Sequence, residues 1–114
     1  MATNPSPTQL DMTTDRTPTE TIVYCTGKIT TDTTELLKTT VKPLLSQSKR
    51  VALDLANVSY MDSSGLGTVV ALYASAKAAS CQLKLINLNE RLKELLTITR
   101  LSALMVDSAF WTAR

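Results

Sequence analysis

Histidine is absent from this chain of 114 residues. A serine or cysteine nucleophile activated by a histidine base is therefore excluded, and so are zinc sites built on histidine. There are only two cysteines, Cys25 and Cys81, too few for a closed thiolate metal site. No phosphate-binding loop of the G-x-x-x-x-G-K-[ST] kind occurs. We therefore expect no metal, no cofactor and no catalysis, with an α/β enzyme or nucleotide-binding protein left as a minor alternative.

Aromatic residues make up only 4% of the chain, and the net charge of +2 comes from charges spread along it. Without a basic block or interleaved aromatics, nucleic acid is not an expected partner. No apolar run reaches the ~18 residues that span a bilayer, so no membrane association is expected. The first residues do not resemble a secretory signal. We expect a cytoplasmic protein whose cysteines are buried, reduced thiols, with a disulfide as the alternative.

Residues 1–19 are rich in Thr, Pro, Ser and Asn and are predicted to be a flexible arm, whose final part could instead form an edge strand. Residues 20–114 are predicted to form a single domain. Strand patterns fall at residues 21–26, 51–55 and 82–88, with a possible short strand at 104–106.

Helical spacing separates these strands. Asp32 and Glu35 read as a capping box, with Asp32 as the cap, and Pro43 predicts that the first helix kinks or ends near Lys42. Asn89 is the expected cap of a later helix, and a brief helix is predicted from Ala109 onward. The first helix has apolar residues at helical spacing, namely Leu36, Leu37, Val41, Leu44 and Leu45. One face of the second helix carries Leu66, Val69, Val70, Tyr73 and Ala76, and the later helix carries Leu92, Leu95, Leu96 and Thr99. Alternating strands and helices predict an α/β fold with a mainly parallel sheet.

The most informative segment lies between the strand at 51–55 and the second helix, and reads D-S-S-G-L-G over residues 62–67. Hydroxyl residues suit a helix N-cap, and glycines allow other atoms to approach the backbone closely. The start of a helix also favours a phosphate or another anion. Ser63 is therefore either a plain cap or a hydroxyl placed where a phosphate switch would act.

Each neighbour of Ser63 has a structural and a functional interpretation. Asp62 caps the helix, or it orients Ser63 and contacts a partner. Ser64 is expected to be a helix cap rather than a second acceptor. Gly65 and Gly67 are expected to serve close packing and turn geometry rather than ligand contact. Leu66 belongs either to the core or to a surface that faces a partner.

The text from Val51 to Gly67, with a V-x-L-D-L strand followed by D-S-S-G-L-G, resembles the STAS domain family, and more narrowly its stand-alone bacterial anti-sigma factor antagonists. The resemblance covers roughly residues 20–110 and includes the later strand from Leu83 and the helix that carries Leu92. It implies a central mixed or mostly parallel β-sheet of four to five strands covered by three to four α-helices.

The resemblance also implies a partner-switching function. The unphosphorylated protein would bind an anti-sigma factor that is also a serine kinase, and so release a sigma factor. The kinase would phosphorylate Ser63, the first serine of the motif, and a PP2C-type phosphatase would reverse this. The protein would be a monomer or weak dimer. The implied partner-binding residues are Thr30, Asp62, Ser63, Ser64, Gly65 and Leu66, and the turn at Thr30 and Thr31 should lie near Ser63.

The chain departs from the family near this expected docking edge. Many relatives carry acidic residues in a Gly-Glu-Leu-Asp segment, where this chain has Lys28 and Thr30 in Gly27-Lys28-Ile29-Thr30. The segment from Asp107 is shorter than the family's closing helix, and Trp111 is either a core residue or an exposed contact. The alternative function is a non-switching STAS subunit of a stressosome-like or lipid-transport complex.

Overall fold

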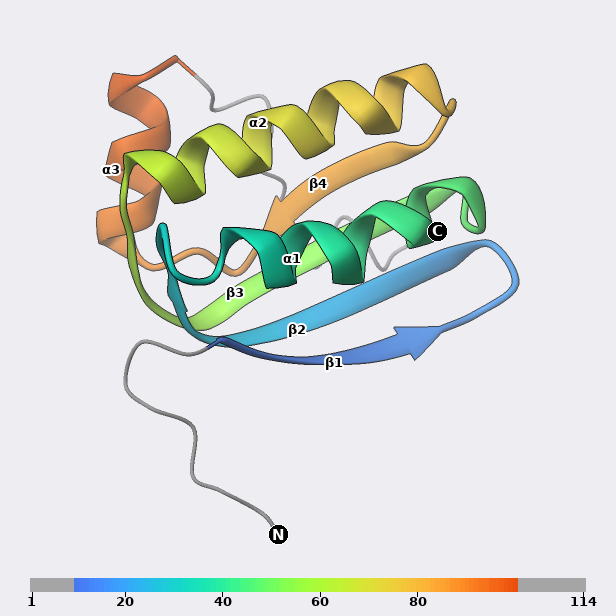
Figure 1. Cartoon of the computed structure of the whole chain (residues 1–114), viewed down its shortest axis with the longest axis horizontal. Helices are drawn as coiled ribbons and strands as arrows, with labels where there is room; N and C mark the ends of the chain where they lie inside the picture. Colours follow the sequence, from blue (N-terminus) through green and yellow to red (C-terminus); the bar gives the residue numbers. More distant parts are fainter. Residues whose placement is uncertain (1–9, 101–114) are drawn as a thin grey trace, which may run out of the picture.

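The computed structural model describes residues 10–100, which form a four-stranded sheet, three α-helices and one 3₁₀-helix. The elements are β1 (Leu10–Arg16), β2 (Glu20–Ile29), α1 (Thr34–Val41), η1 (Lys42–Ser46), β3 (Arg50–Met61), α2 (Ser63–Ala78), β4 (Gln82–Ile86) and α3 (Glu90–Ile98). The strand order is β1-β2-β3-β4 (Figure 1). β1 pairs antiparallel with β2, whereas β2–β3 and β3–β4 are parallel, which confirms the predicted mixed, mostly parallel sheet.

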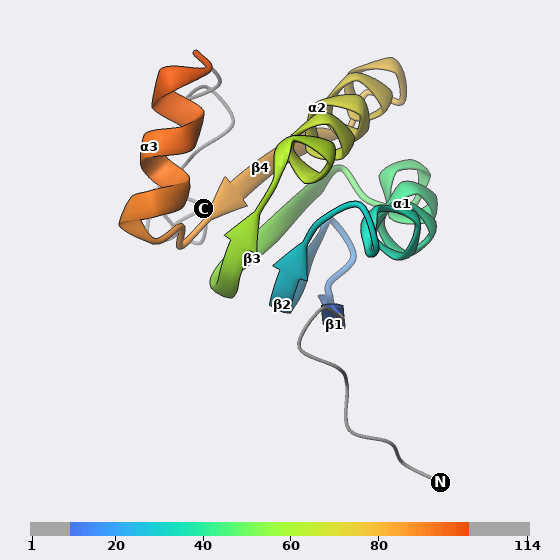
Figure 2. The same cartoon turned by 60° about the vertical axis from the view of Figure 1, so that its left-hand side comes forward.

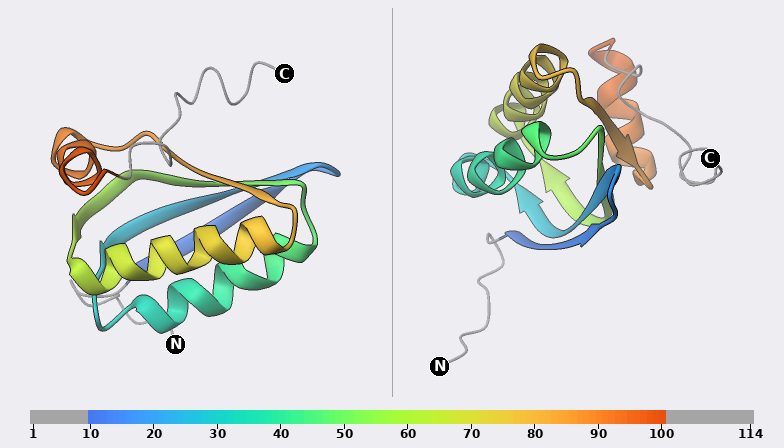
Figure 3. Two further views of the ribbon diagram at one scale, coloured as in Figure 1. Left: turned by 90° about the horizontal axis from the view of Figure 1, so that it is seen from above. Right: turned by 90° about the vertical axis from the view of Figure 1, so that its right-hand side faces the viewer.

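Helices cover the sheet unequally on its two faces. α1 and α2 cover one face of the sheet, and α3 lies apart from them, beside β4 (Figures 2 and 3). The face beneath α1 and α2 buries the alternate side chains Val51, Leu53 and Leu55 of β3, because successive strand residues point to opposite faces. On the other face, Ala52 and Ile86 form a smaller buried cluster against Ile22.

Several predicted boundaries are confirmed. α1 ends at Val41, and the chain continues as η1 with Pro43 in its first turn, because proline cannot supply the helical N–H. Asn89 caps α3, since its side chain accepts a hydrogen bond from the backbone N–H of Leu92 at 2.9 Å.

Cys25 and Cys81 are both buried free thiols.

Other predictions are wrong at the level of single residues. Asp32 does not cap α1: the N-cap position is Thr33, which makes no side-chain capping bond. On α2 the buried stripe is Gly65, Val69, Leu72 and Ala76, so that Val70 is 37% exposed. A helix rich in small and apolar residues on every side gives no periodicity that separates Val70 from Leu72.

The strands β2 and β3 are longer than predicted, whereas β4 ends at Ile86 rather than Leu88. β2 and β3 stay paired as far as Ile29 and Met61, with register shifts between Tyr24 and Thr26 and between Gly27 and Lys28. Gly27 has a φ of 124°, a conformation that favours glycine, and it lies at the second shift.

β1 lies within residues 1–19 and occupies the edge of the sheet, as in the edge-strand alternative for that segment. The assignment of residues 20–114 to one domain stays a prediction. The predicted strand at 104–106, the terminal helix and Trp111 lie outside the described residues.

Candidate functional site

Ser63 lies where β3 gives way to α2. It is the first residue of α2, and its side chain is exposed. Because β2 and β3 are parallel, both end at the same edge of the sheet, and the start of α2 and the turn from β2 to α1 meet there (Figure 1). This edge is where α/β sheets present ligand and partner sites.

Asp62 holds the start of α2 to the neighbouring turn. It is the N-cap residue, with extended backbone, and its Oδ1 accepts a hydrogen bond from the N–H of Gly65 at 2.8 Å. Its Oδ2 accepts from the N–H of Thr31 at 3.3 Å. One carboxylate thus binds both the helix and the turn, which confirms the capping interpretation of Asp62 and leaves its functional interpretation a prediction.

The turn at Thr30 and Thr31 lies beside the motif, as the resemblance implies. The N–H of Asp62 donates to the carbonyl of Ile29 at 3.2 Å, and the hydroxyl of Thr31 donates to the Ser64 hydroxyl oxygen at 2.9 Å. The expected capping role of Ser64 is therefore wrong. Its hydroxyl accepts from Thr31, while Asp62 accepts from the helix N–H.

Thr33 is a structural residue of this turn that the sequence reasoning missed. It is 3% exposed, and its hydroxyl accepts from the N–H of Thr30 and donates to the carbonyl of Lys28, both at 2.9 Å. The sequence does contain a feature that predicts this role. Thr33 follows Thr30 by three residues in a turn, and threonine hydroxyls in turns often form hydrogen bonds with nearby backbone groups. The Thr30 hydroxyl oxygen is buried and has no hydrogen-bond partner among residues 10–100.

The two glycines of the motif differ in their surroundings. A Cβ on Gly65 would collide with the carbonyl oxygen of Ile29 and lie 2.8 Å from Cγ2 of the same residue. Close packing therefore explains Gly65. A Cβ on Gly67 would meet nothing within 4 Å, so the expectation that Gly67 serves packing is wrong.

Leu66 follows the core interpretation in part, because its half-buried side chain packs against the main core. Lys28 is half-buried and pairs across the sheet with Tyr60, which is 44% exposed. Lys28 therefore places a cation on β2 beside the end of β3, two residues before Asp62 in the paired strand.

The thiols lack the features of a nucleophile. Burial, with a smaller effect from the charge of Asp54, raises the pKa of Cys25 to about 12. Burial also raises the pKa of Cys81 above its ordinary value. Both side chains are therefore protonated near neutral pH, whereas reactive cysteines need a lowered pKa and access to solvent.

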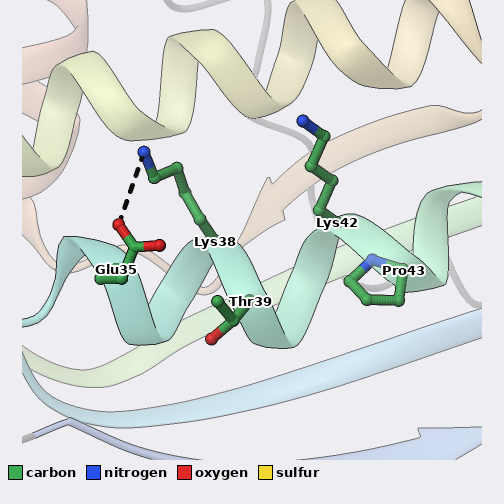
Figure 4. A pocket seen from close by; sticks show the side chains of 5 residues that line it. All are labelled: Glu35, Lys38, Thr39, Lys42 and Pro43. Carbon is green, nitrogen blue, oxygen red and sulfur yellow. Dashed lines mark ion pairs between the residues drawn. The ribbon is translucent and has the colours of Figure 1, made fainter.

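A separate hollow of about 490 Å³ lies on α1 and the start of η1, lined by Glu35, Lys38, Thr39, Lys42 and Pro43. In Figure 4 the side chains of Lys38 and Lys42 point to one side of α1 and Thr39 to the other. Glu35 forms an ion pair with Lys38 at 3.8 Å. None of the residues that line this hollow belongs to the motif at residues 62–67.

Residues 10–100 hold no group of three or more Cys, Asp or Glu side chains placed to bind a metal ion. No helix in this range is long and apolar enough to cross a bilayer.

Comparison with known proteins gives consistent results. A family model described as the STAS domain matches residues 11–113. The chain is 38% identical over 87 residues to an anti-sigma-B factor antagonist of Bacillus subtilis (strain 168), a match that covers 76% of this chain and 80% of the relative.

Two solved structures share the fold. The anti-sigma factor antagonist SpoIIAA in its unphosphorylated form matches with a TM-score of 0.74 and 17% identity, covering 85% of this chain and 87% of the other. The phosphorylated form of the Bacillus cell fate determinant SpoIIAA matches with a TM-score of 0.72 and 17% identity, covering 91% of this chain and all of the other.

Proposed function

Because the chain belongs to the STAS domain family, we propose that it is an anti-sigma factor antagonist switched by phosphorylation of Ser63. The unphosphorylated form binds an anti-sigma factor that is also a serine kinase, and so releases a sigma factor. The relative from Bacillus subtilis, named an anti-sigma-B factor antagonist, supports this assignment. The observation that carries it is the exposed Ser63 hydroxyl at the first position of α2, beside an aspartate that already satisfies the helix cap.

The covalent step is a phosphoryl transfer. The kinase moves the γ-phosphoryl group of ATP to Oγ of Ser63: the new P–O bond forms there, the bond to the β-phosphate oxygen breaks, and ADP leaves. The hydroxyl proton passes to a base on the kinase. A PP2C-type phosphatase reverses the modification with water, which restores the serine and yields inorganic phosphate.

The phosphate acts through charge at a docking surface. It adds a charge of about −1.5 to −2 at neutral pH beside the Asp62 carboxylate. If phosphorylation makes the free energy of partner binding less favourable by about 1–3 kcal/mol, the affinity for the partner falls about 5- to 150-fold. The dipole at the start of α2 stabilises the added anion, so that the domain stays folded. The similarity of this fold to both forms of SpoIIAA supports a switch that acts on the surface alone.

The proposed docking surface combines the start of α2 with the turn from β2. Gly65 is buried beneath Ile29, so its part is to keep this turn close to the helix. The cation at Lys28 alters the charge that a partner meets at this edge. The residues that we assign to direct contact are Thr30, Asp62, Ser63, Ser64 and Leu66.

The test uses the purified full chain with each anti-sigma factor kinase encoded in its source genome. At least one kinase should bind the chain and, with ATP, add one phosphate, measured by intact mass and located by peptide mass spectrometry at Ser63. The Ser63→Ala variant should bind and take up none, whereas Ser64→Ala is the matched control and should take up one. Stable binding with no phosphate added would instead favour the non-switching subunit, and phosphate on another residue would contradict the assigned site.

A further inference from the structure

Gly67 is an exposed glycine inside a helix, one turn after Ser63. Its surroundings do not require glycine, because an added Cβ would meet nothing within 4 Å. Its backbone does not require glycine either. Among the described glycines only Gly27 has a positive φ, whereas Gly67 is helical.

A helix-interior glycine without such a reason lowers the stability of the chain that carries it. Relative to alanine, it lowers the folded-to-unfolded ratio by about two- to fivefold, because glycine loses more conformational freedom on folding. Gly65 offers the contrast within the same turn, since Ile29 leaves no room for a Cβ there. The packing of residues 10–100 therefore explains one glycine and not the other.

The exposed face of α2 around Gly67 is uncharged, with the Ser63 and Ser64 hydroxyls on one side and Val70 and Ala71 on the other. From Ser63 to Ala76 α2 carries no charged residue, and Val70, the next residue along the exposed face, is 37% exposed. Residues four apart on a helix lie about 5–6 Å from each other on its surface. A stable interface of about 800 Å² on each partner, centred on Ser63, would extend about 16 Å from that residue. A kinase that reaches the Ser63 hydroxyl therefore covers Gly67 as well.

We infer that Gly67 helps determine which anti-sigma factor kinase binds the chain. The kinase places an apolar group in direct contact with the α2 backbone at Gly67, where no side chain intervenes. A Cβ at this position would hold the kinase away from the helix and from Ser63. The glycine is then kept for the partner, at the expense of the stability of the free chain. This inference rests on the proposed function, because it names a contact of the same docking surface.

The test compares Gly67→Ala with Ala78→Ser in the full chain. The control adds one heavy atom at another exposed position of α2, about 22 Å along the helix from Ser63 and outside the expected footprint. Thermal melts of the free proteins are read first. Gly67→Ala should raise the melting temperature by about 2–6 °C.

Binding is then measured by calorimetry with the genome-encoded kinase that binds the wild type. Gly67→Ala should lose affinity about 5- to 150-fold, as expected for an added methyl group in a packed contact. It should also be phosphorylated more slowly, while Ala78→Ser stays within twofold of the wild type. Unchanged affinity of Gly67→Ala, or a lower melting temperature, would overturn the inference and leave the proposed function standing. If no kinase binds the wild type, both fail.

Discussion

Two substitutions of Asp62, to alanine and to asparagine, separate its structural role from its role in docking. Asp62→Ala removes the acceptor for the N–H of Gly65, at 2.8 Å, and the acceptor for the N–H of Thr31, at 3.3 Å. Asp62→Asn keeps an acceptor oxygen at the cap and removes the negative charge. The two variants therefore differ in which interactions they retain.

The expected magnitudes follow from these contacts. Loss of an N-cap side chain costs about 1 kcal/mol, within a range of about 0.5–2 kcal/mol. The longer bond to Thr31 adds about 0.5 kcal/mol, and the charge at the helix start about 0.3–1 kcal/mol. Asp62→Ala should therefore lower the free energy of unfolding by about 2 kcal/mol, and Asp62→Asn by less than about 1 kcal/mol.

Urea unfolding followed by circular dichroism measures both values under two-state conditions. Equal loss in the two variants would refute the assignment of most of the effect to the cap hydrogen bond. A loss below about 0.3 kcal/mol in Asp62→Ala would refute the capping role itself. Kinase binding by the well-folded Asp62→Asn protein then tests whether the charge also contributes to docking.

Three further predictions concern stability. Gly65→Ala should lower the free energy of unfolding by about 1–3 kcal/mol, because its Cβ meets the Ile29 backbone; a neutral result in urea unfolding would contradict the close packing. Cys25 has its ordinary pKa of 9.0 when unfolded and about 12 when folded, so its contribution is complete below pH 9 and is lost as the pH rises toward 12. Between pH 8 and 10.5 the wild type should therefore lose about 2 kcal/mol more than Cys25→Ala, and parallel pH profiles would disprove this. Asn89→Ala should lose about 2 kcal/mol, because the bonds to the N–H of Leu92 and to the carbonyl of Val58 are both lost, whereas Asn89→Ser, which retains a capping acceptor for Leu92, should lose less.

The sequence predicts the fold well where a pattern has one physical cause. A β-branched run placed β2 and apolar runs placed β3 and β4, Pro43 marked the end of α1, and Asn89 marked the start of α3. The edge of the sheet that carries Ser63 followed from the parallel pairing, which strand–helix alternation requires.

Residue-level errors arose where several residues compete for one role. Asp62 and Ser64 are both good caps, and the choice depends on Thr31, whose hydroxyl engages Ser64 from a turn 33 positions away in sequence. The different reasons for the two motif glycines depend on where Ile29 lies, which local sequence does not specify.

The central claim is tested most directly by the affinity of the kinase for the chain in its two covalent states. Chain fully phosphorylated at Ser63, with occupancy verified by mass, is compared with unmodified chain by calorimetry against the same kinase. Phosphorylation should weaken binding about 5- to 150-fold. Equal affinity at full occupancy would contradict the switch and leave only the shared fold.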